Sequence, residues 1–214
     1  VEYALVRHWQ DSGLLQPTSP TAGIGPSEGM VVVSGSVSST TAQQIAWSLE
    51  NGFVGVPFDA TAICQSDVAA ENEIMRVVAA AADALAKGRD PLIYTAQGPE
   101  DPAVARFKTA VAASGQDMSL VNRRVGEALG RVLQNVLART GTRRAVVSGG
   151  DTSGYATRQL GIFALTALAP TIPGAAIFKA HADGPMDGLE LALKGGQMGS
   201  EDYFGWIRDG GGAR

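Results

Sequence analysis

The chain has 214 residues, of which 45% are hydrophobic and 18% are charged, and its formal net charge is −4. This balance can build a sizeable hydrophobic core and excludes a disordered chain. Because neither half carries a basic stripe, we expect no nucleic-acid partner. No stretch approaches the roughly 20 apolar residues of a membrane helix, so we expect no membrane partner. The single cysteine, Cys64, excludes an internal disulfide and favours a reducing compartment, and we expect a cytoplasmic protein.

The elements follow in chain order from hydrophobic spacing and from turn residues. A helix is predicted over 2–15, followed by a proline- and glycine-rich linker over 16–29. Strands are predicted at 30–33, 53–58, 92–95, 145–147, 162–168, 175–178 and 189–193. Helices are predicted at 40–49, 66–87, 101–113, 120–140, 152–160 and 201–207, with a loose tail from 209 onward.

Short apolar strands that alternate with helices predict an α/β domain of three layers, α/β/α. The strands are continuous apolar runs, which is typical of a sheet buried on both faces. The last third of the chain is richer in strands than the rest. We therefore expect a central sheet that is mostly parallel or mixed.

Two strand-to-helix turns share an unusual composition, in VVVSGSVSSTT from Val31 and in VVSGGDTSG from Val146. The first amides of a helix have no intrahelical partner, and with the helix dipole they attract anions. Glycine lets an anion approach the backbone, while serine and threonine hydroxyls add donors. The same residues are also ordinary helix caps and loop residues. The turns alone therefore predict an anion site without identifying the anion.

A third segment, LALKGGQMGSEDYF from Leu191, has glycines that allow tight turns directly after a predicted strand. The backbone of Gly196 could lie against a ligand, and Lys194 or Lys179 could supply positive charge. Ser200, Glu201 and Asp202 are more simply explained as caps of the next helix.

Three standard motifs are excluded. Gly149 to Gly154 has the glycine spacing of a Walker A loop, but Tyr155 and Ala156 follow where lysine and serine or threonine are required. The GxSxG match at 25–29 precedes a strand instead of following one. The two histidines and the cysteine have no zinc-ligand spacing, and we assign no metal-ligating residue.

The segments SGSVSSTTAQQI, VVSGGDTSG and LALKGGQMGSEDYF, in this order, resemble the C-terminal nucleotide-binding domain of the four-carbon acid sugar kinase family. The resemblance covers the chain from about Val31 onward. The opening VEYALVRHW resembles the segment that follows the family's N-terminal sugar-binding domain. On this basis residues 1–29 are a helix and linker from the junction with a missing sugar-binding domain, and residues 30–214 are the nucleotide-binding domain.

The resemblance implies a carbohydrate kinase that uses ATP and Mg²⁺ to phosphorylate a four-carbon sugar acid such as threonate, erythronate or 3-oxo-tetronate. It implies nucleotide contacts at Ser38 with Ser36 beside it, at Gly149, Gly150, Asp151 and Thr152, and at Gly196. Asp151 stands where members often have glutamate, Val37 where cysteine is common, and Gly195 where serine is common. The shorter carboxylate of Asp151 would alter the reach of a Mg²⁺ or ribose contact.

The sugar acid is expected to bind mainly to the missing domain, so we expect this chain to be inactive by itself. No catalytic base is assigned, and a homodimer is left open. Two other classes remain open at this stage. One is a non-catalytic α/β domain that binds a ligand or a protein, and the other is a sugar-phosphate isomerase or aldolase domain that uses the turns for a substrate phosphate.

Overall fold

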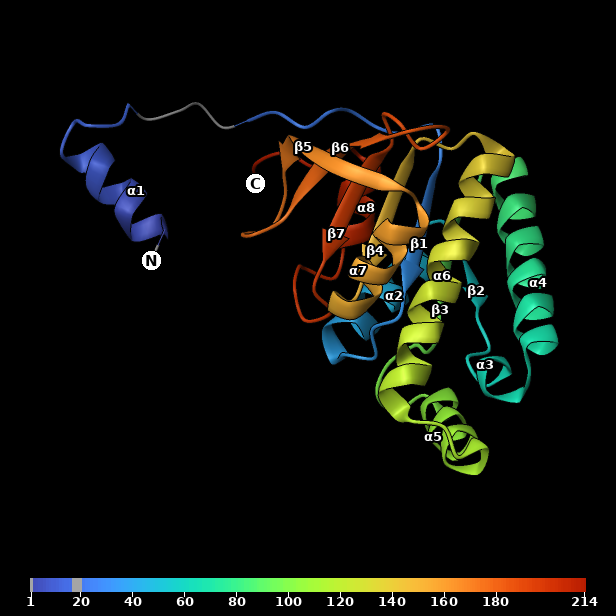
Figure 1. Cartoon of the computed structure of the whole chain (residues 1–214). Helices are drawn as coiled ribbons and strands as arrows, with labels where there is room; N and C mark the ends of the chain where they lie inside the picture. The colour runs from blue at the N-terminus through green and yellow to red at the C-terminus, as the bar shows by residue number, and fades with distance from the viewer. Residues whose placement is uncertain (1, 17–20) are drawn as a thin grey trace.

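The computed structural model describes residues 2–16 and 21–214, and it shows a seven-stranded sheet covered by helices on both faces (Figure 1). The strands are β1 (Met30–Ser34), β2 (Phe53–Pro57), β3 (Asp90–Tyr94), β4 (Arg144–Ser148), β5 (Ile162–Pro170), β6 (Ala176–Ala182) and β7 (Glu190–Lys194). Their order is β2-β3-β1-β4-β7-β6-β5. The first five in this order are parallel, and β6 and β5 are antiparallel additions at one side.

The helices are α1 (Glu2–Asp11), α2 (Ser39–Glu50), α3 (Ala62–Gln65), α4 (Asp67–Ala86), α5 (Pro102–Ser114), α6 (Met118–Thr140), α7 (Gly150–Gln159) and α8 (Tyr203–Arg208). Side chains alternate between the faces of a strand, so Val31 and Val33 join the core beneath α4, α6 and α7. Met30 and Val32 join a second core with α2 and α8. The three-layer fold with a mixed sheet is therefore confirmed.

The parallel strands direct their carboxyl ends to one edge of the sheet, at the lower side of Figure 1, where α2 and α5 also lie. Ser34 is in register with Ser148, and Ser148 is in register with Lys194. Three strands therefore end level with one another. The loops that follow them must start side by side.

Three local predictions need correction. The one-turn helix α3 is too short for a periodicity signal and was not predicted, and the first helix ends at Asp11 instead of residue 15. The tail from 209 onward is not loose. Gly212 donates from its amide to the Pro170 carbonyl oxygen at 2.9 Å, and the Arg214 guanidinium lies 4.3 Å from the Trp206 ring.

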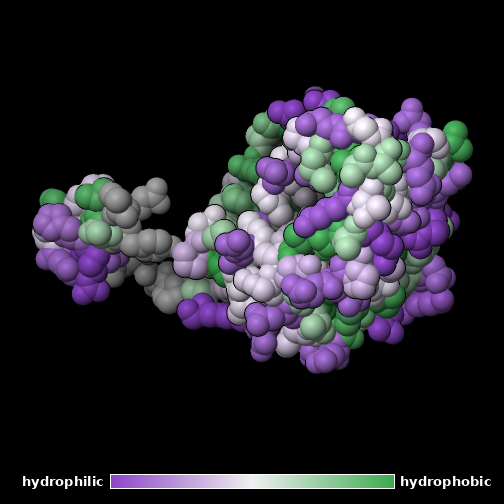
Figure 2. Space-filling view, turned by 90° about the horizontal axis from the view of Figure 1, so that it is seen from below, coloured by the Kyte–Doolittle hydropathy of each residue, from purple (hydrophilic) through white to green (hydrophobic). Residues whose placement is uncertain are grey.

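Helix α1 stands apart from the layered domain in Figures 1 and 2, and its described side chains are almost all exposed. Part of the predicted linker, residues 17–20, lies outside the described residues. None of the described helices has the length and apolarity needed to cross a membrane.

Candidate functional site

The loops after β1, β4 and β7 meet at the carboxyl edge of the sheet. We call residues 35–38, 149–152 and 195–199 the loop cluster. The Gly35 amide donates to the Ser148 carbonyl oxygen at 3.1 Å, and the Gly149 amide donates to the Lys194 carbonyl oxygen at 3.0 Å. Each loop is thus tied to the end of the next strand. The two turns singled out from the sequence lie side by side, and the third segment lies with them.

The first turn presents three hydroxyls close together. Ser38 is the N-cap of α2, where its Oγ accepts a hydrogen bond of 3.1 Å from the Thr41 amide. The Thr41 Oγ1 lies 3.0 Å from the Ser36 Oγ and 3.2 Å from the Ser38 Oγ. Hydroxyl hydrogens can rotate toward whichever acceptor is present. This group of hydroxyls can therefore donate to an anion at the start of α2.

The turn after β7 lies directly against these hydroxyls. The carbonyl oxygen of Gly196 accepts hydrogen bonds from Ser38 Oγ and from Thr41 Oγ1, the latter at 2.7 Å. A Cβ added to Gly196 would overlap the Ser36 Oγ. Glycine is required here because the backbone of one loop touches the side chains of another, and the ligand contact expected at Gly196 stays a prediction.

The second turn leads from β4 into the start of α7. Gly149 has a φ of 122°, which L side chains rarely adopt, and its carbonyl oxygen accepts the Ser153 amide at 2.9 Å. The amides of the three residues between them precede this first intrahelical bond. No atom lies within 4 Å of a Cβ built on Gly150, so the backbone is open at this point.

The side chains of this turn differ in position. Asp151 is exposed at the start of α7. Thr152 is buried, and its hydroxyl occupies the space beside Gly35 and Gly149. Its side chain therefore packs between the two turns, and a ligand contact of Thr152 stays a prediction for its amide.

Beneath the loop cluster lies a polar row, of which sequence reasoning singled out only Lys194, as a possible source of positive charge. Ser34, Ser148 and Lys194 end their strands on one face and are at most 3% exposed. The Ser148 Oγ makes no hydrogen bond with any described residue. Buried hydroxyls usually have a partner, so this one marks a polar site that is incomplete within the described chain.

Lys194 is buried without an ion pair to any carboxylate in the described part of the chain. Its Nζ donates to the Gly195 carbonyl oxygen at 3.0 Å and lies 3.5 Å from Thr41 Oγ1. Burial lowers the pKa of Lys194 from 10.5 to about 8. Lys179, the other lysine considered, is exposed on β6 in register with Glu190, at the opposite end of β7.

A cavity of about 980 Å³ opens at the same edge, beyond the ends of β2 and β3. Ala42 of α2 lines it near the loop cluster, and Tyr94, Gln97 and the start of α5 line it farther away. Figure 2 looks onto this edge, where pale residues of intermediate hydropathy occupy much of the middle of the surface. The loop cluster therefore adjoins enough space for a bound small molecule.

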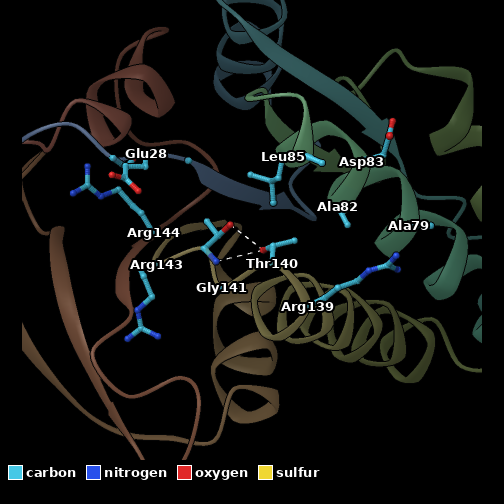
Figure 3. A pocket seen from close by; sticks show the side chains of 14 residues that line it. Glu28, Ala79, Ala82, Asp83, Leu85, Arg139, Thr140, Gly141, Arg143 and Arg144 are labelled. Atoms are coloured by element: carbon cyan, nitrogen blue, oxygen red, sulfur yellow. Dashed lines mark hydrogen bonds between the residues drawn. The ribbon is translucent and has the colours of Figure 1, made fainter.

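A second cavity, of about 860 Å³, lies at the opposite edge of the sheet (Figure 3). The carboxyl ends of α4 and α6 border it, and helix carboxyl ends repel anions. Arg144 forms an ion pair of 2.6 Å with Glu190 and donates to the Gly25 carbonyl oxygen. Arg143 donates to the Pro185 carbonyl oxygen, so both guanidinium groups already have partners. Despite its arginines, this cavity is a poor phosphate site.

The described residues offer few side chains that could bind a metal ion. Among residues 2–16 and 21–214, no group of three histidine, cysteine or carboxylate side chains is placed to hold a metal ion. Asp151 is the acidic side chain within the loop cluster. A Mg²⁺ ion usually binds one or two carboxylates together with phosphate oxygens, so a lone carboxylate fits Mg²⁺ that arrives with a nucleotide.

The nucleotide-binding C-terminal domain family matches residues 31–204. The chain belongs to this family. A 3-oxo-isoapionate kinase from Paraburkholderia graminis is 41% identical over 212 residues, which cover 98% of this chain and 45% of that protein. A 3-oxo-tetronate kinase from Cupriavidus necator is 31% identical over 208 residues, which cover 95% of this chain and 43% of that protein. The resemblance to the four-carbon acid sugar kinases is thereby confirmed.

The fold recurs in a solved structure from Haemophilus influenzae, with a TM-score of 0.67 and 22% identity over 93% of this chain and 44% of that one. The chain spans less than half the length of each of these relatives. The roles of the individual loop-cluster residues stay predictions.

Proposed function

We propose that the loop cluster binds the phosphates of ATP together with Mg²⁺, and that the chain is the nucleotide-binding part of a carbohydrate kinase. The observation that carries this proposal is the convergence of three side-chain-poor turns at one sheet edge, with helix starts directed at the space between them. Ligands of open α/β sheets bind at this edge. The kinase names of the similar proteins supply the class of reaction.

Each loop has a defined task in this proposal. The amides of Gly150, Asp151 and Thr152 bind phosphate oxygens at the start of α7, where the helix dipole favours negative charge. The hydroxyls of Ser36 and Ser38 would rotate their hydrogens away from their present acceptors, Ser38 Oγ and the Gly196 carbonyl oxygen, and donate to further phosphate oxygens. Phosphoryl transfer depends mainly on positioning the reacting groups and on neutralising the charge of the phosphates. The amides and hydroxyls of the loop cluster would contribute to both.

Mg²⁺ would screen charge between phosphate oxygens when it is bound, and Asp151, the carboxylate of the loop cluster, would hold it. Gly196 keeps its backbone close to the hydroxyls and so closes one side of the site. No side chain in the loop cluster is assigned as a catalytic base. We expect the base to belong to the part of the protein that this chain does not include.

The acceptor is proposed to be a four-carbon sugar acid or a related 3-oxo sugar acid. Residues 1–29 would connect this domain to a sugar-binding domain, and residues 30–214 would form the nucleotide-binding domain. The acceptor would bind mainly to the other domain and meet the nucleotide across a cleft. We further propose a cytoplasmic location, and a homodimer is to be tested by sedimentation of the chain.

Calorimetry of the 214-residue chain with Mg·ATP tests the function. We expect measurable binding that Gly150→Val abolishes, since the valine would enter the open space over the α7 amides. Binding of a sugar phosphate in preference to Mg·ATP would favour an isomerase or aldolase domain, and binding of neither would favour a non-catalytic domain. We expect no turnover of threonate, erythronate or 3-oxo-tetronate by this chain alone, and robust turnover would contradict the two-domain arrangement.

A further inference from the structure

The carboxyl edge of the sheet holds a positive charge that is not paired with any carboxylate of the described chain. Lys194 is 3% exposed and ends β7 directly below the turn that contains Gly196. Its Nζ faces the aromatic rings of Tyr203 and Phe204, each with its centroid 5.9 Å away, and these cation–π contacts stabilise the charge only in part. Burying a lysine in this way is costly unless a counter-charge is present.

The nearest helix makes this position less favourable for a cation. The Nζ approaches Thr41 in the first turn of α2, where the helix dipole is positive, and this turn contains no acidic residue. A cation at the amino end of a helix raises the local positive potential instead of neutralising it. The arrangement therefore favours a bound anion more strongly than a helix start does alone.

A continuous polar path leads from the lysine to the surface of the loop cluster. The Nζ lies 3.5 Å from Thr41 Oγ1, which in turn lies 3.0 Å from Ser36 Oγ. The register neighbour of Lys194 is Ser148, whose buried hydroxyl makes no hydrogen bond with a described residue. Two independent features, a buried cation and an unpartnered hydroxyl, thus occupy the same end of the sheet.

We propose that Lys194 is the buried counter-charge for the nucleotide phosphates, acting through the hydroxyls of Thr41 and Ser36. It is a positioning residue, because it acts on the phosphates through other side chains. This proposal rests on the proposed function. It adds a specific residue to the site and assigns a function to a buried lysine that has no ion pair within the described chain.

Few titratable groups surround Lys194, so a proton taken up on nucleotide binding can be assigned to it. Thr41 from α2, Ser148 from β4 and Phe204 from α8 carry no charge. Tyr203 is the titratable neighbour, and burial raises its pKa to about 12, so it stays neutral below pH 10. The pKa of Lys194, lowered to about 8 by burial, should rise again when phosphates bind, and the protein would then take up a proton.

The test compares the wild-type chain with Lys194→Met and with Lys179→Met, which removes an exposed lysine of β6. Mg·ATP binding is measured by calorimetry at pH 8.5 in two buffers of different ionisation enthalpy. We expect Lys194→Met to weaken binding by about tenfold or more and Lys179→Met to leave it within about twofold. If the pKa returns toward its usual value, wild type should take up about three quarters of a proton per nucleotide at this pH, and Lys194→Met none.

Thermal unfolding without nucleotide separates this role from a structural one. Lys194→Met should melt at the wild-type temperature or higher, because it removes a buried charge. A lower melting temperature, or wild-type affinity in Lys194→Met, would overturn the role of Lys194 while leaving the proposed function standing. If the wild-type chain itself binds no Mg·ATP, the proposed function fails and this inference fails with it.

Discussion

Thr41 Oγ1 donates a hydrogen bond of 2.7 Å to the carbonyl oxygen of Gly196, which lies 155 residues later in the chain. The bond joins the first turn of α2 to the loop after β7. It is possible because Gly196 has no side chain to separate the two segments. The contact determines both the shape of the loop cluster and the tolerance of position 196 to substitution.

Gly196→Ala should damage the nucleotide site. The added Cβ would overlap Ser36 Oγ and force the two loops apart. We expect Mg·ATP affinity to fall by about tenfold or more, with a loss of about 1 to 3 kcal/mol in the free energy of unfolding. The measurements are calorimetry and urea denaturation.

The matched control is Gly154→Ala in α7, where no atom lies within 4 Å of the new Cβ. Alanine is the better helix former, so stability should be unchanged or raised by up to about 1 kcal/mol. Equal affinities of the two variants would contradict the role of Gly196.

Ser38→Ala should affect both stability and binding. It removes the N-cap of α2, at a cost of about 1 kcal/mol, and it removes a hydroxyl from the loop cluster. Ser66→Ala is the control, since Ser66 caps α4 through a similar bond of 3.0 Å to the Ala69 amide. Urea denaturation should show a loss for Ser38→Ala at least as large as for Ser66→Ala, since Ser38 also donates to the Gly196 carbonyl oxygen, while calorimetry should show weaker Mg·ATP binding only for Ser38→Ala. Weakening in both variants would indicate a general effect of capping.

Stability should increase with pH above neutrality because of Lys194. Its pKa is about 8 in the folded chain and 10.5 when unfolded, so the unfolded chain binds more protons between these values. The cost of the buried charge is complete below pH 8 and disappears as the pH rises toward 10.5. Between pH 7.5 and 9.5 we expect the free energy of unfolding to rise by about 1 to 2 kcal/mol.

Lys194→Met supplies the comparison for the pH series and should lack this rise. The series stays below pH 10 because Tyr203 acts in the opposite direction. Its pKa of about 12 in the folded chain exceeds the usual 10, so its contribution to stability is lost as the pH rises above 10. The same rise in wild type and in Lys194→Met would assign the effect to another group.

Removal of residues 210–214 should destabilise the domain. Arg214 pairs with Asp202 at 2.7 Å and covers the Trp206 ring, and the Gly212 amide bonds to β5. We expect a loss of about 1 to 3 kcal/mol in urea denaturation, with Arg214→Ala accounting for part of it. Unchanged stability after truncation would restore the sequence-based expectation of a loose tail.

Much of the architecture follows from local sequence. Asp101 with Pro102 starts α5, and Gly141 ends α6 in the left-handed conformation, so these boundaries depend on caps and turn residues that can be recognised along the chain. The apolar runs of β1 and β4 predict buried strands for the same reason. The tail was misjudged because its glycines lack side chains, and its order comes from backbone bonds to distant segments.

The alternation of strands and helices, the two small-residue turns and the resemblance to a kinase family could all be predicted from the sequence, because these features depend on neighbours along the chain. The tertiary structure alone decided that three turns meet at one edge and that Lys194 lies buried beneath them. In LALKGG the lysine resembles any surface lysine at the end of a strand. Its burial results from α2 and α8 packing over the sheet, and residues so far apart in sequence come together only when the chain folds.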